Sequence, residues 1–489
     1  MFGFSKVKRL KSFAGQNVMK LGNGSVISCM LIFLCIFFLL KARFCPASTG
    51  TRCLFKHVRP MFGIINTRSL GSRTAMVQNE SSSHLISDEA REQPICDISG
   101  KRSDTCDVVA DIRVVTHGRN STANSTTVTI SGSFNSQRRA EEWRIRPYAR
   151  KGDVTAMNHV TEILLQTDPR NPPRCTRNHT VPALIFSTAG YTGNFFHDFT
   201  DVLVPLFITS HRFHGEVQFL VTDMKPLWIS KFQLILRQLS RYQVIDVNHG
   251  EDGVHCFRRA IIGTIFHQEL GVNPLKFPTG SSILGFKQLL RRAFSLERET
   301  VTPVVGGNTT ASRPPRLLII SRKRSRAFMN VREIVDLAKS LGFEVVVAEA
   351  NLSTDVGKFA RLVNSCDVML GVHGAGLTNM IFLPHGAVLI QLIPFGRLEW
   401  VARSSFKDPA VKMKVRYLEY SLREDETSLS EQYPRDDPVL KHPLQIHKQG
   451  WSMVRSVYLV KQNVKPHLGR LRSKLLESLE LLKSPQESI

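Results

Sequence analysis

Short apolar runs alternate with longer amphipathic stretches along the chain from residue 182 onward. Continuous short apolar runs are typical of buried strands, and apolar residues spaced three or four apart are typical of helices. In the first part of this region the pattern predicts helices at 195–210, 226–239 and 281–294, and strands at 183–187, 217–223, 242–247 and 258–265. This alternation predicts a parallel sheet covered by helices.

The alternation restarts after residues 299–315, a segment with Gly and Pro that we interpret as a linker between two lobes. It then predicts helices at 331–341, 355–364 and 377–382, and strands at 316–321, 343–349, 367–372 and 387–393. We therefore expect an α/β protein with two facing Rossmann-like lobes. In such sheets, ligands bind beyond the carboxyl ends of the strands.

The most apolar stretch of the chain is 26–40, VISCMLIFLCIFFLL, and several Lys and Arg residues precede it. This layout predicts an uncleaved signal-anchor, although a cleaved signal peptide has a core of similar length. Lys41 and Arg43 follow directly, without a small-residue cleavage site, which favours the anchor. We expect a cytosolic tail at 1–23, a transmembrane helix at 24–40, a flexible stem at 41–92, an acceptor lobe at 93–312 and a nucleotide-sugar lobe at 313–489, the last with a returning C-terminal helix.

Acceptor sequences for N-glycosylation favour a lumenal body. Six follow the apolar run, whereas Asn23 alone precedes it. The six begin at Asn79, Asn120, Asn124, Asn178, Asn308 and Asn351. An oxidising lumen permits disulfides, and Cys96 lies close enough to Cys106 to form a small bridged loop.

The formal net charge of +24 raises the alternative of a nucleic-acid-binding protein. A membrane anchor followed by a lumenal body argues against that alternative, because a lumenal chain does not meet nucleic acid. We therefore expect no nucleic-acid partner.

Residues 371–379, GVHGAGLTN, follow a predicted buried strand and open a predicted helix. Gly374 and Gly376 allow a tight turn, and amides at a helix start can bind a phosphate. His373 and Thr378 add side-chain donors. On spacing alone, a glycine-rich turn that only packs a strand on a helix explains the pattern equally well.

Longer motifs carry a family resemblance. The segment GVHGAGLTNMIFLPHGAVLIQLIP (371–394) resembles the signature of glycosyltransferase family 61. The segments FSTAGYTGNFFHDFTDVLVPLF (186–207), RPPRLLIISRKRSRAFMN (313–330) and VNSCDVMLGVHGAGLTN (363–379) are similar to further motifs of its plant members. The resemblance covers nearly the whole expected lumenal region.

This resemblance implies a GT-B-like fold and inverting transfer from a nucleotide sugar. Plant members act largely on xylan in the Golgi, adding arabinofuranosyl or xylosyl groups from UDP-sugars. Other relatives modify N-glycans or O-linked sugars of proteins. A catalytically idle lumenal scaffold of wall-polysaccharide synthesis is an alternative from another class.

Inverting transfer needs a base that removes the acceptor hydroxyl proton. His197 and Asp201 are four residues apart on a predicted helix and share one face. We expect His197 or Asp198 to be the base, and Asp201 to orient it or bind the acceptor. Helix capping alone would also explain the two aspartates.

We expect the donor diphosphate to contact Arg322, His373, Gly374, Ala375, Gly376, Thr378 and Asn379. Arg322 belongs to a basic cluster with Lys323, Arg324 and Arg326, and we favour it because it lies closest to a strand end. Asn330 is better explained as a helix cap than as a catalytic residue.

Two features concern metal dependence and departures from the family pattern. No D-x-D motif follows a predicted strand, so we expect transfer without a metal or another cofactor. Ala189 stands where the resemblance leads us to expect Gly, and His442 where it leads us to expect an acidic residue.

Overall fold

The computed structural model describes residues 96–118, 125–131, 142–167, 172–277, 281–301, 313–349 and 354–483. The chain divides into two compact units, Met1–Asp88 and Glu89–Ile489, and all described residues belong to the second. The expected signal-anchor and stem lie outside them, as do the sequons other than that of Asn178. Within the described ranges, no helix combines the length and apolar character needed to cross a membrane.

The first half of the described chain forms a ten-stranded sheet with the order β4-β5-β3-β2-β10-β7-β8-β9, to which β1 and β6 add at β2 and β10. The strands are β1 (Cys96–Asp97), β2 (Thr105–Thr116), β3 (Ser125–Ser131), β4 (Glu142–Ile145), β5 (Glu162–Thr167), β6 (Arg177–Asn178), β7 (Ala183–Ser187), β8 (Gln218–Thr222), β9 (Ile245–Asp246) and β10 (Gly253–Ile262). Only β7, β8, β9 and β10 form the expected parallel part. The parallel pairing predicted for the strands after residue 182 is therefore confirmed, but the sheet as a whole is mixed, because β2 pairs antiparallel with both β10 and β3.

The helices of this half are α2 (Val154–Met157), α3 (Phe195–His197), α4 (Val204–Ser210), α5 (Pro226–Leu239) and α6 (Ile283–Phe294). The helix predicted at 195–210 contains a π-helical turn, η1 (Asp198–Leu203), between α3 and α4. Pro205 lies at the start of α4 and has no amide to bond the carbonyl four residues earlier. The amide of Val204 reaches back five residues to Phe199 instead. The short 3-10 turns η2 (His211–Phe213) and η3 (Pro274–Lys276) complete this half.

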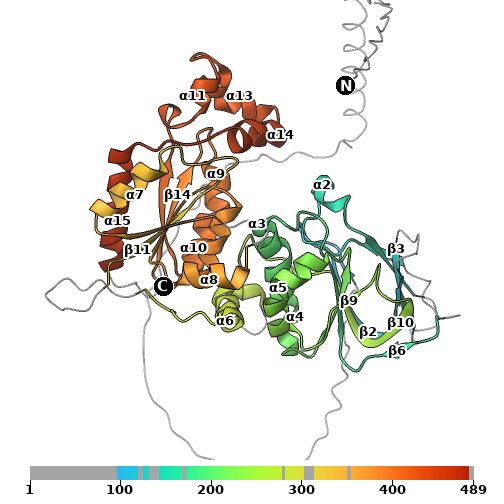
Figure 1. Cartoon of the computed structure of the whole chain (residues 1–489). Helices are drawn as coiled ribbons and strands as arrows, with labels where there is room; N and C mark the ends of the chain where they lie inside the picture. The colour runs from blue at the N-terminus through green and yellow to red at the C-terminus, as the bar shows by residue number, and fades with distance from the viewer. Residues whose placement is uncertain are drawn as a thin grey trace, which may run out of the picture. The chain divides into compact units, whose positions relative to one another are not determined.

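The second half forms a five-stranded, fully parallel sheet with the order β12-β11-β13-β14-β15. Its strands are β11 (Arg316–Ile320), β12 (Glu344–Ala348), β13 (Val368–Val372), β14 (Val388–Ile393) and β15 (Arg416–Ser421). The helices α7 (Val331–Ser340) and α15 (Leu468–Lys483) lie on one side of it, and α8 (Val356–Asn364) and α10 (Asp408–Lys412) lie on the other (Figure 1). This sheet is the doubly wound arrangement that the sequence predicted.

Short helical segments join and follow the last three strands. They are η4 (Ala375–Phe382), α9 (Glu399–Ala402), η5 (Arg403–Lys407), η6 (Glu424–Glu426), α11 (Leu429–Gln432), α12 (Pro438–Lys441), α13 (Pro443–Lys448), α14 (Trp451–Val454) and η7 (Arg455–Val460). The helix predicted at 377–382 is present as the 3-10 helix η4, which starts at Ala375.

One apolar core is shared by the two sheets. It contains Phe199 and Phe207 of the first half together with Leu377, Phe382 and Leu389 of the second. A second core fills the space between the parallel sheet and the helices α7 and α15. The shared core fixes η1 against η4, and these two segments carry the residues that the sequence singled out.

Two disulfides tie the first sheet together. Cys96–Cys106 is the bridge that the sequence predicted, and Cys175–Cys256 joins residues 81 apart in the chain. Cys366 is a buried free thiol.

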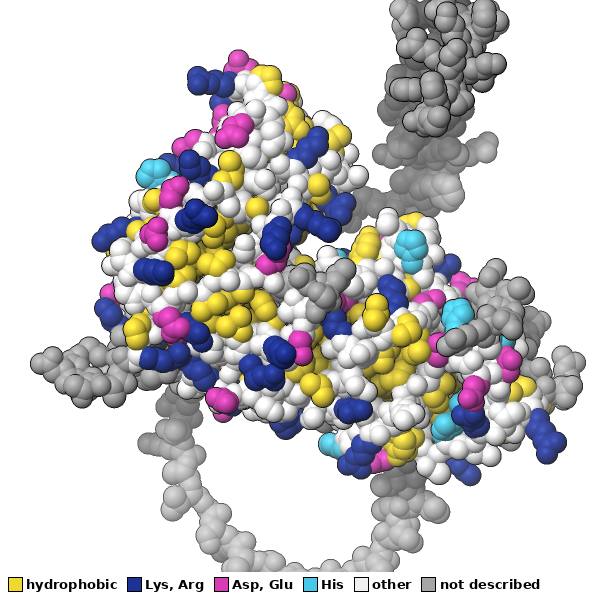
Figure 2. Space-filling view, in the orientation of Figure 1, with side chains coloured by type: hydrophobic (Ala, Val, Ile, Leu, Met, Phe, Trp, Pro, Cys, Tyr) yellow, Lys and Arg dark blue, Asp and Glu magenta, His cyan; other side chains and the backbone are white. Residues whose placement is uncertain are grey.

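Lys and Arg side chains are spread over the face in Figure 2 and interspersed with acidic and apolar groups. A nucleic-acid-binding protein more often gathers its basic residues in a patch or stripe. On this face, the large net charge does not form such a stripe.

Candidate active site

The glycine loop begins where β13 ends and turns tightly into η4. Gly374 has φ 145° and ψ 178°, a region that only glycine adopts readily. A Cβ atom at Gly374 would lie 2.6 Å from Nη1 of Arg326 and 3.0 Å from Nη1 of Arg322. A Cβ atom at Gly376 would instead meet Ile320 of β11 at 2.9 Å. The first glycine thus makes room for two guanidinium groups, and the second allows the loop to pack on the sheet.

Arg322 and Arg326 form no salt bridge with the residues that the structure describes. Nη1 of Arg326 donates to the carbonyl of His373 at 2.7 Å, while its Nε is buried without a partner among those residues. Burial lowers the pKa of Arg322. Burial, Arg322 and Arg455 together lower the pKa of Arg326 to about 9. Both side chains are half-buried, and the charge of Glu349 offsets the effect of burial on Arg322 only in part. Two neighbouring, partly buried cations without an ion-pair partner form a site for an anion.

The other two members of the basic cluster lie away from the loop. The Lys323 side chain is 85% exposed and pairs with Glu349 at 3.7 Å, and Arg324 is exposed. Sequence reasoning favoured Arg322 over its neighbours, whereas the geometry brings Arg322 and Arg326 together.

His373 is buried beside these guanidinium groups. Its Nδ1 lies 2.8 Å from Nε2 of Gln391, and its ring packs edge-on against Phe406. Burial, together with Arg326 and Arg322, lowers the pKa of His373 to about 3. The ring is therefore neutral at physiological pH and retains one N–H group.

The remaining residues of the predicted loop differ in their contacts. Thr378 is fully buried, and its hydroxyl has no partner among the described residues. The side chain of Asn379 donates to the carbonyl of Gly376 at 2.9 Å. Asn379 therefore stabilises the turn, and its amide group is already used there. Ala375 is half-buried at the start of η4.

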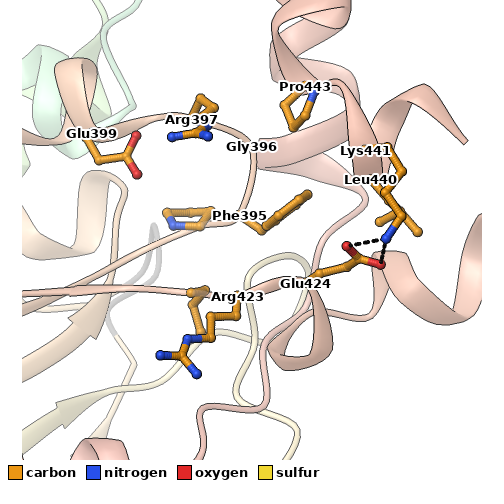
Figure 3. A pocket seen from close by; sticks show the side chains of 11 residues that line it. Phe395, Gly396, Arg397, Glu399, Arg423, Glu424, Leu440, Lys441 and Pro443 are labelled. Carbon is orange, nitrogen blue, oxygen red and sulfur yellow. Dashed lines mark hydrogen bonds and ion pairs between the residues drawn. The ribbon is translucent and has the colours of Figure 1, made fainter. Parts of the chain in front are cut away.

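A cavity of about 340 Å³ lies beyond the carboxyl ends of β14 and β15 (Figure 3). Its lining residues are Pro394, Phe395, Gly396, Arg397, Glu399, Leu422, Arg423, Glu424, Leu440, Lys441 and Pro443. Its polar groups include the ion pair between Glu424 and Lys441 at 3.2 Å. This is the edge of a parallel sheet at which ligands commonly bind.

His197 of α3 and Asp201 of η1 form a hydrogen-bonded pair. Nδ1 of His197 lies 2.9 Å from Oδ2 of Asp201, and Arg150 and Tyr148 donate to the same carboxylate. Burial alone would raise the pKa of Asp201, but the hydrogen bond from His197 and the charge of Arg150 hold it below its usual range. Nη2 of Arg150 also lies 3.2 Å from Nδ1 of His197, but the contact with Asp201 is shorter. An ionised carboxylate only accepts hydrogen bonds, so this shorter contact favours a proton on Nδ1. Nε2 is then left with a lone pair.

Asp198 has a different environment from its two neighbours. It is fully buried, and its Oδ1 accepts from Nε1 of Trp228 at 2.8 Å and from the amide of Gly193 at 2.7 Å. Burial raises the pKa of Asp198, and the bonds from Gly193 and Trp228 only partly offset this. The geometry gives Asp198 a structural role in joining α5 to the turn before α3. Its Oδ2 is buried without a partner among the described residues, and a role of Asp198 as the base stays a prediction.

Aromatic contacts connect the two groups of residues. Phe406 packs edge-on against Phe196, the neighbour of His197, with ring centroids 5.7 Å apart. The same ring packs against His373, with centroids 5.5 Å apart. Helix α3 also packs on η4. The histidine–aspartate pair and the glycine loop therefore approach one another around Phe406.

Comparison with known proteins places this arrangement in a family. The family model Glycosyltransferase 61 matches residues 195–390. The rice (Oryza sativa subsp. japonica) protein "Beta-1,2-xylosyltransferase XYXT1" is 40% identical over 79% of this chain and 84% of its own length. The chain belongs to the glycosyltransferase 61 family. The Arabidopsis thaliana protein "Xylan glycosyltransferase MUCI21" is a further relative, 36% identical over 80% of both chains.

A rice relative of higher identity is longer than the matched region. "Alpha-1,3-arabinosyltransferase XAT3" is 48% identical over 80% of this chain, but the match spans 66% of that protein. The family match at 195–390 includes His197, Asp201, Arg322, Arg326 and the glycine loop.

The residues by which this glycosyltransferase 61 chain departs from the expected pattern leave the site intact. The position that requires glycine is Gly190, which follows Ala189. Gly190 has φ 55°, and a Cβ atom there would lie 2.5 Å from the Tyr148 ring. His442 is exposed between α12 and α13. Asn330 occupies the cap position of α7, but its side chain donates to the carbonyl of Pro466 and makes no cap bond, so that expectation was wrong.

No group of three or more potential metal ligands occurs within the described ranges of the chain. The acidic segment 424–426 is used structurally, since buried Glu426 pairs with Arg470 and with the hydroxyl of Tyr420. Metal-independent transfer stays a prediction.

Sequence reasoning missed Gln391 and Tyr417, whose side chains lie behind His373. Gln391 was visible as the one polar residue inside the apolar run 387–393. A polar residue inside a buried strand needs partners, and that requirement was the available signal.

Proposed function

We propose that this chain is an inverting glycosyltransferase that moves a pentose, arabinofuranose or xylose, from a UDP-sugar onto xylan. The observation that carries the proposal is the half-buried pair Arg322 and Arg326, which face the glycine loop without an ion-pair partner in the described chain. The names of the rice and Arabidopsis relatives support a pentose donor and a xylan acceptor. We further propose a GT-B-like arrangement of the two sheets and a type II position in the Golgi membrane.

In this proposal the donor diphosphate lies over the glycine loop. The guanidinium groups and the N–H of His373 neutralise and bind its oxygens, and the hydroxyl of Thr378 gains a partner. The nucleoside occupies the cavity beyond β14 and β15. The negative charge that develops on the leaving UDP then meets fixed cations, so no metal is required at this step.

The transfer itself is a single displacement at the anomeric carbon. The acceptor oxygen forms a bond to that carbon while the bond to the UDP oxygen breaks, and UDP leaves with the electron pair. Nε2 of His197 takes the acceptor proton, and Asp201 stabilises the resulting imidazolium. Because attack occurs opposite the leaving group, the anomeric configuration inverts.

A binding experiment tests the donor site with a matched pair of cations. We expect Arg326→Met to weaken UDP binding about 10- to 100-fold in calorimetry, since a charge-assisted hydrogen bond is lost. The control Lys323→Met removes an exposed cation from the same loop and should leave the affinity unchanged. Equal affinities in the two variants would refute the assignment of the diphosphate site.

An activity experiment tests the reaction. The full-length chain is offered UDP-arabinofuranose or UDP-xylose with xylo-oligosaccharides, and a pentosylated product is expected in mass spectrometry. His197→Ala should reduce turnover about 10²- to 10⁴-fold, whereas Asp198→Asn should stay within a few-fold of wild type. Folded protein that binds UDP but transfers neither pentose would contradict the pentosyltransferase proposal. Folded protein that binds no UDP would support an idle scaffold.

A second acceptor class is tested in the same assay. The bovine (Bos taurus) "Protein O-linked-mannose beta-1,4-N-acetylglucosaminyltransferase 2" is 24% identical over 41% of this chain. Transfer from UDP-N-acetylglucosamine to a mannosyl peptide, with no pentose transfer, would favour that function. For localisation, an N-glycan on exposed Asn178 is expected, and an unshifted band after peptide N-glycosidase treatment would argue against a lumenal body.

A further inference from the structure

Gln391 is a fully buried polar side chain in the otherwise apolar strand β14. In the sheet register, Gln391 lies beside Gly371 of β13 and Glu419 of β15. His373 and Tyr417 are two positions away from these residues along the chain, so they lie on the same sheet face as Gln391. One end of its amide meets Nδ1 of His373 at 2.8 Å, and the other end accepts from the hydroxyl of Tyr417 at 3.0 Å. Three neighbouring strands thus build one hydrogen-bonded row that ends at the glycine loop.

The distances fix the direction of this row. The hydroxyl of Tyr417 has one proton and lies closer to Oε1 of Gln391, at 3.0 Å, than to Oε2 of Glu419, at 3.5 Å. Both oxygens of Glu419 are already held by Arg403, at 2.7 and 2.9 Å. The shorter contact favours donation from Tyr417 to Oε1 of Gln391, which leaves the amide nitrogen facing the imidazole. An NH₂ group only donates, so Nδ1 accepts and the single ring proton is on Nε2.

The surroundings of His373 contain cations and an aromatic ring. Arg326 donates to its backbone carbonyl, Arg322 lies beside the loop, and Phe406 packs on the ring. A second proton on this imidazole would add a charge next to two guanidinium groups. The ring is therefore suited to donate a hydrogen bond as a neutral group and unsuited to act as a base.

We propose that Gln391 and Tyr417 are positioning residues that hold His373 in its neutral Nε2–H tautomer, so that it presents an N–H donor to the donor-sugar diphosphate. The opposite tautomer would present a lone pair to a phosphate oxygen, which repels it. This inference rests on the proposed function for the identity of the anion. The state of the ring can be measured without any activity.

Long-range ¹⁵N NMR of histidine-labelled full-length chain, assigned with His373→Ala, reports the tautomer directly. The Nε2–H form is expected in wild type. In Gln391→Glu, a carboxylate that accepts replaces the amide NH₂ group that donates to His373. The imidazole of His373 must then carry its proton on Nδ1. UDP affinity in this variant should fall about 10- to 100-fold at pH ~8. It should recover toward pH ~6, because an imidazole beside a carboxylate takes up a second proton and regains Nε2–H. Wild-type affinity should have no such transition.

Two further variants keep the outcome decisive. Gln218→Glu buries a carboxylate in β8 of the other sheet, away from any proposed ligand, and should leave the UDP affinity unchanged. Tyr417→Phe retains the volume but frees the amide to rotate. It should give a mixture of tautomers and a loss of affinity of about threefold to tenfold.

Specific results would overturn the inference. An Nδ1–H tautomer in the wild-type spectrum would do so, as would wild-type UDP affinity at pH ~8 in Gln391→Glu. If that variant does not fold, an unchanged tautomer and unchanged affinity in Tyr417→Phe would be equally decisive. A wild-type chain that shows the Nε2–H form but binds no UDP would instead refute the proposed function and leave the positioning role standing.

Discussion

Gly374→Ala should separate the glycine loop's role in binding from its role in folding. The added methyl group would lie 2.6 Å from Nη1 of Arg326, where ordinary contacts begin near 3.4 Å. The guanidinium would have to retreat by about 0.8 Å to restore such a contact. That movement breaks the 2.7 Å bond to the carbonyl of His373 and pushes the charge out of the proposed phosphate position.

The expected magnitudes differ for stability and for binding. A non-glycine residue at φ 145° and ψ 178° costs about 1–3 kcal/mol of backbone strain, which lowers the free energy of unfolding. Displacing one charge-assisted contact to phosphate should cost about 2 kcal/mol of binding free energy. The dissociation constant for UDP should therefore rise about 30-fold.

Gly342→Ala is the matched control. Gly342 lies between α7 and β12 with φ 89°, and nothing lies within 4 Å of a Cβ placed there. It therefore incurs backbone strain but displaces no side chain. Calorimetric titration with UDP should give a wild-type dissociation constant for Gly342→Ala and a weakened one for Gly374→Ala. Wild-type affinity in folded Gly374→Ala would refute the link between the loop and the two arginines.

Three further predictions concern stability and reactivity. Burial lowers the pKa of Lys287 to about 7, below the value of 10.5 in the unfolded chain. The unfolded state holds the extra proton between these values, so the free energy of unfolding should rise with pH across that window, by up to about 1.4 kcal/mol per unit. Urea titrations at several pH values should show this rise, and Lys287→Met should flatten it. Cys175→Ser with Cys256→Ser removes a cross-link between residues 81 apart and should lower stability by about 2–5 kcal/mol, seen as an earlier urea midpoint with a steeper slope, because the unfolded chain can expand further. Burial also raises the pKa of Cys366 to about 11, so this thiol should resist a disulfide reagent until the protein is unfolded, and rapid labelling in the native state would contradict its buried position.

The second sheet was readable from sequence because of how parallel sheets are buried. Its strands are covered on both faces and therefore appear as continuous apolar runs, such as β14. Helix α5 was predicted with both ends correct, since Pro226 occupies its first turn. In these elements the local pattern and the tertiary environment agree.

The first sheet was less readable because its pairing is not local. Strand β10 was predicted at 258–265 but runs over Gly253–Ile262. Its first half, GVHCF, lacks a continuous apolar run and is held by β2 and by the disulfide from Cys256 to Cys175. Those partners lie far away in the chain, and no pattern within β10 indicates them.

The positions of the site residues in the chain were predicted more accurately than the roles of those residues. Arg326 was ranked behind Arg322 because it is farther from the strand end. A left-handed turn at Arg326, φ 54°, accompanies its approach to Gly374. Such a conformation is rare outside glycine, so the sequence did not indicate that Arg326 approaches Gly374. Asp198 could be separated from His197 only by the partner Trp228, which comes from another helix.

The apolar core shared by the two sheets has a consequence for how the protein loses activity. Phe199, beside the proposed base, and Leu377 and Phe382, in the segment after the glycine loop, belong to the same buried cluster. Neither sheet can expose that cluster without leaving the other half uncovered. We expect the two halves to melt in one cooperative transition, so that heat inactivation removes the capacity to bind donor and the capacity to activate acceptor at the same temperature.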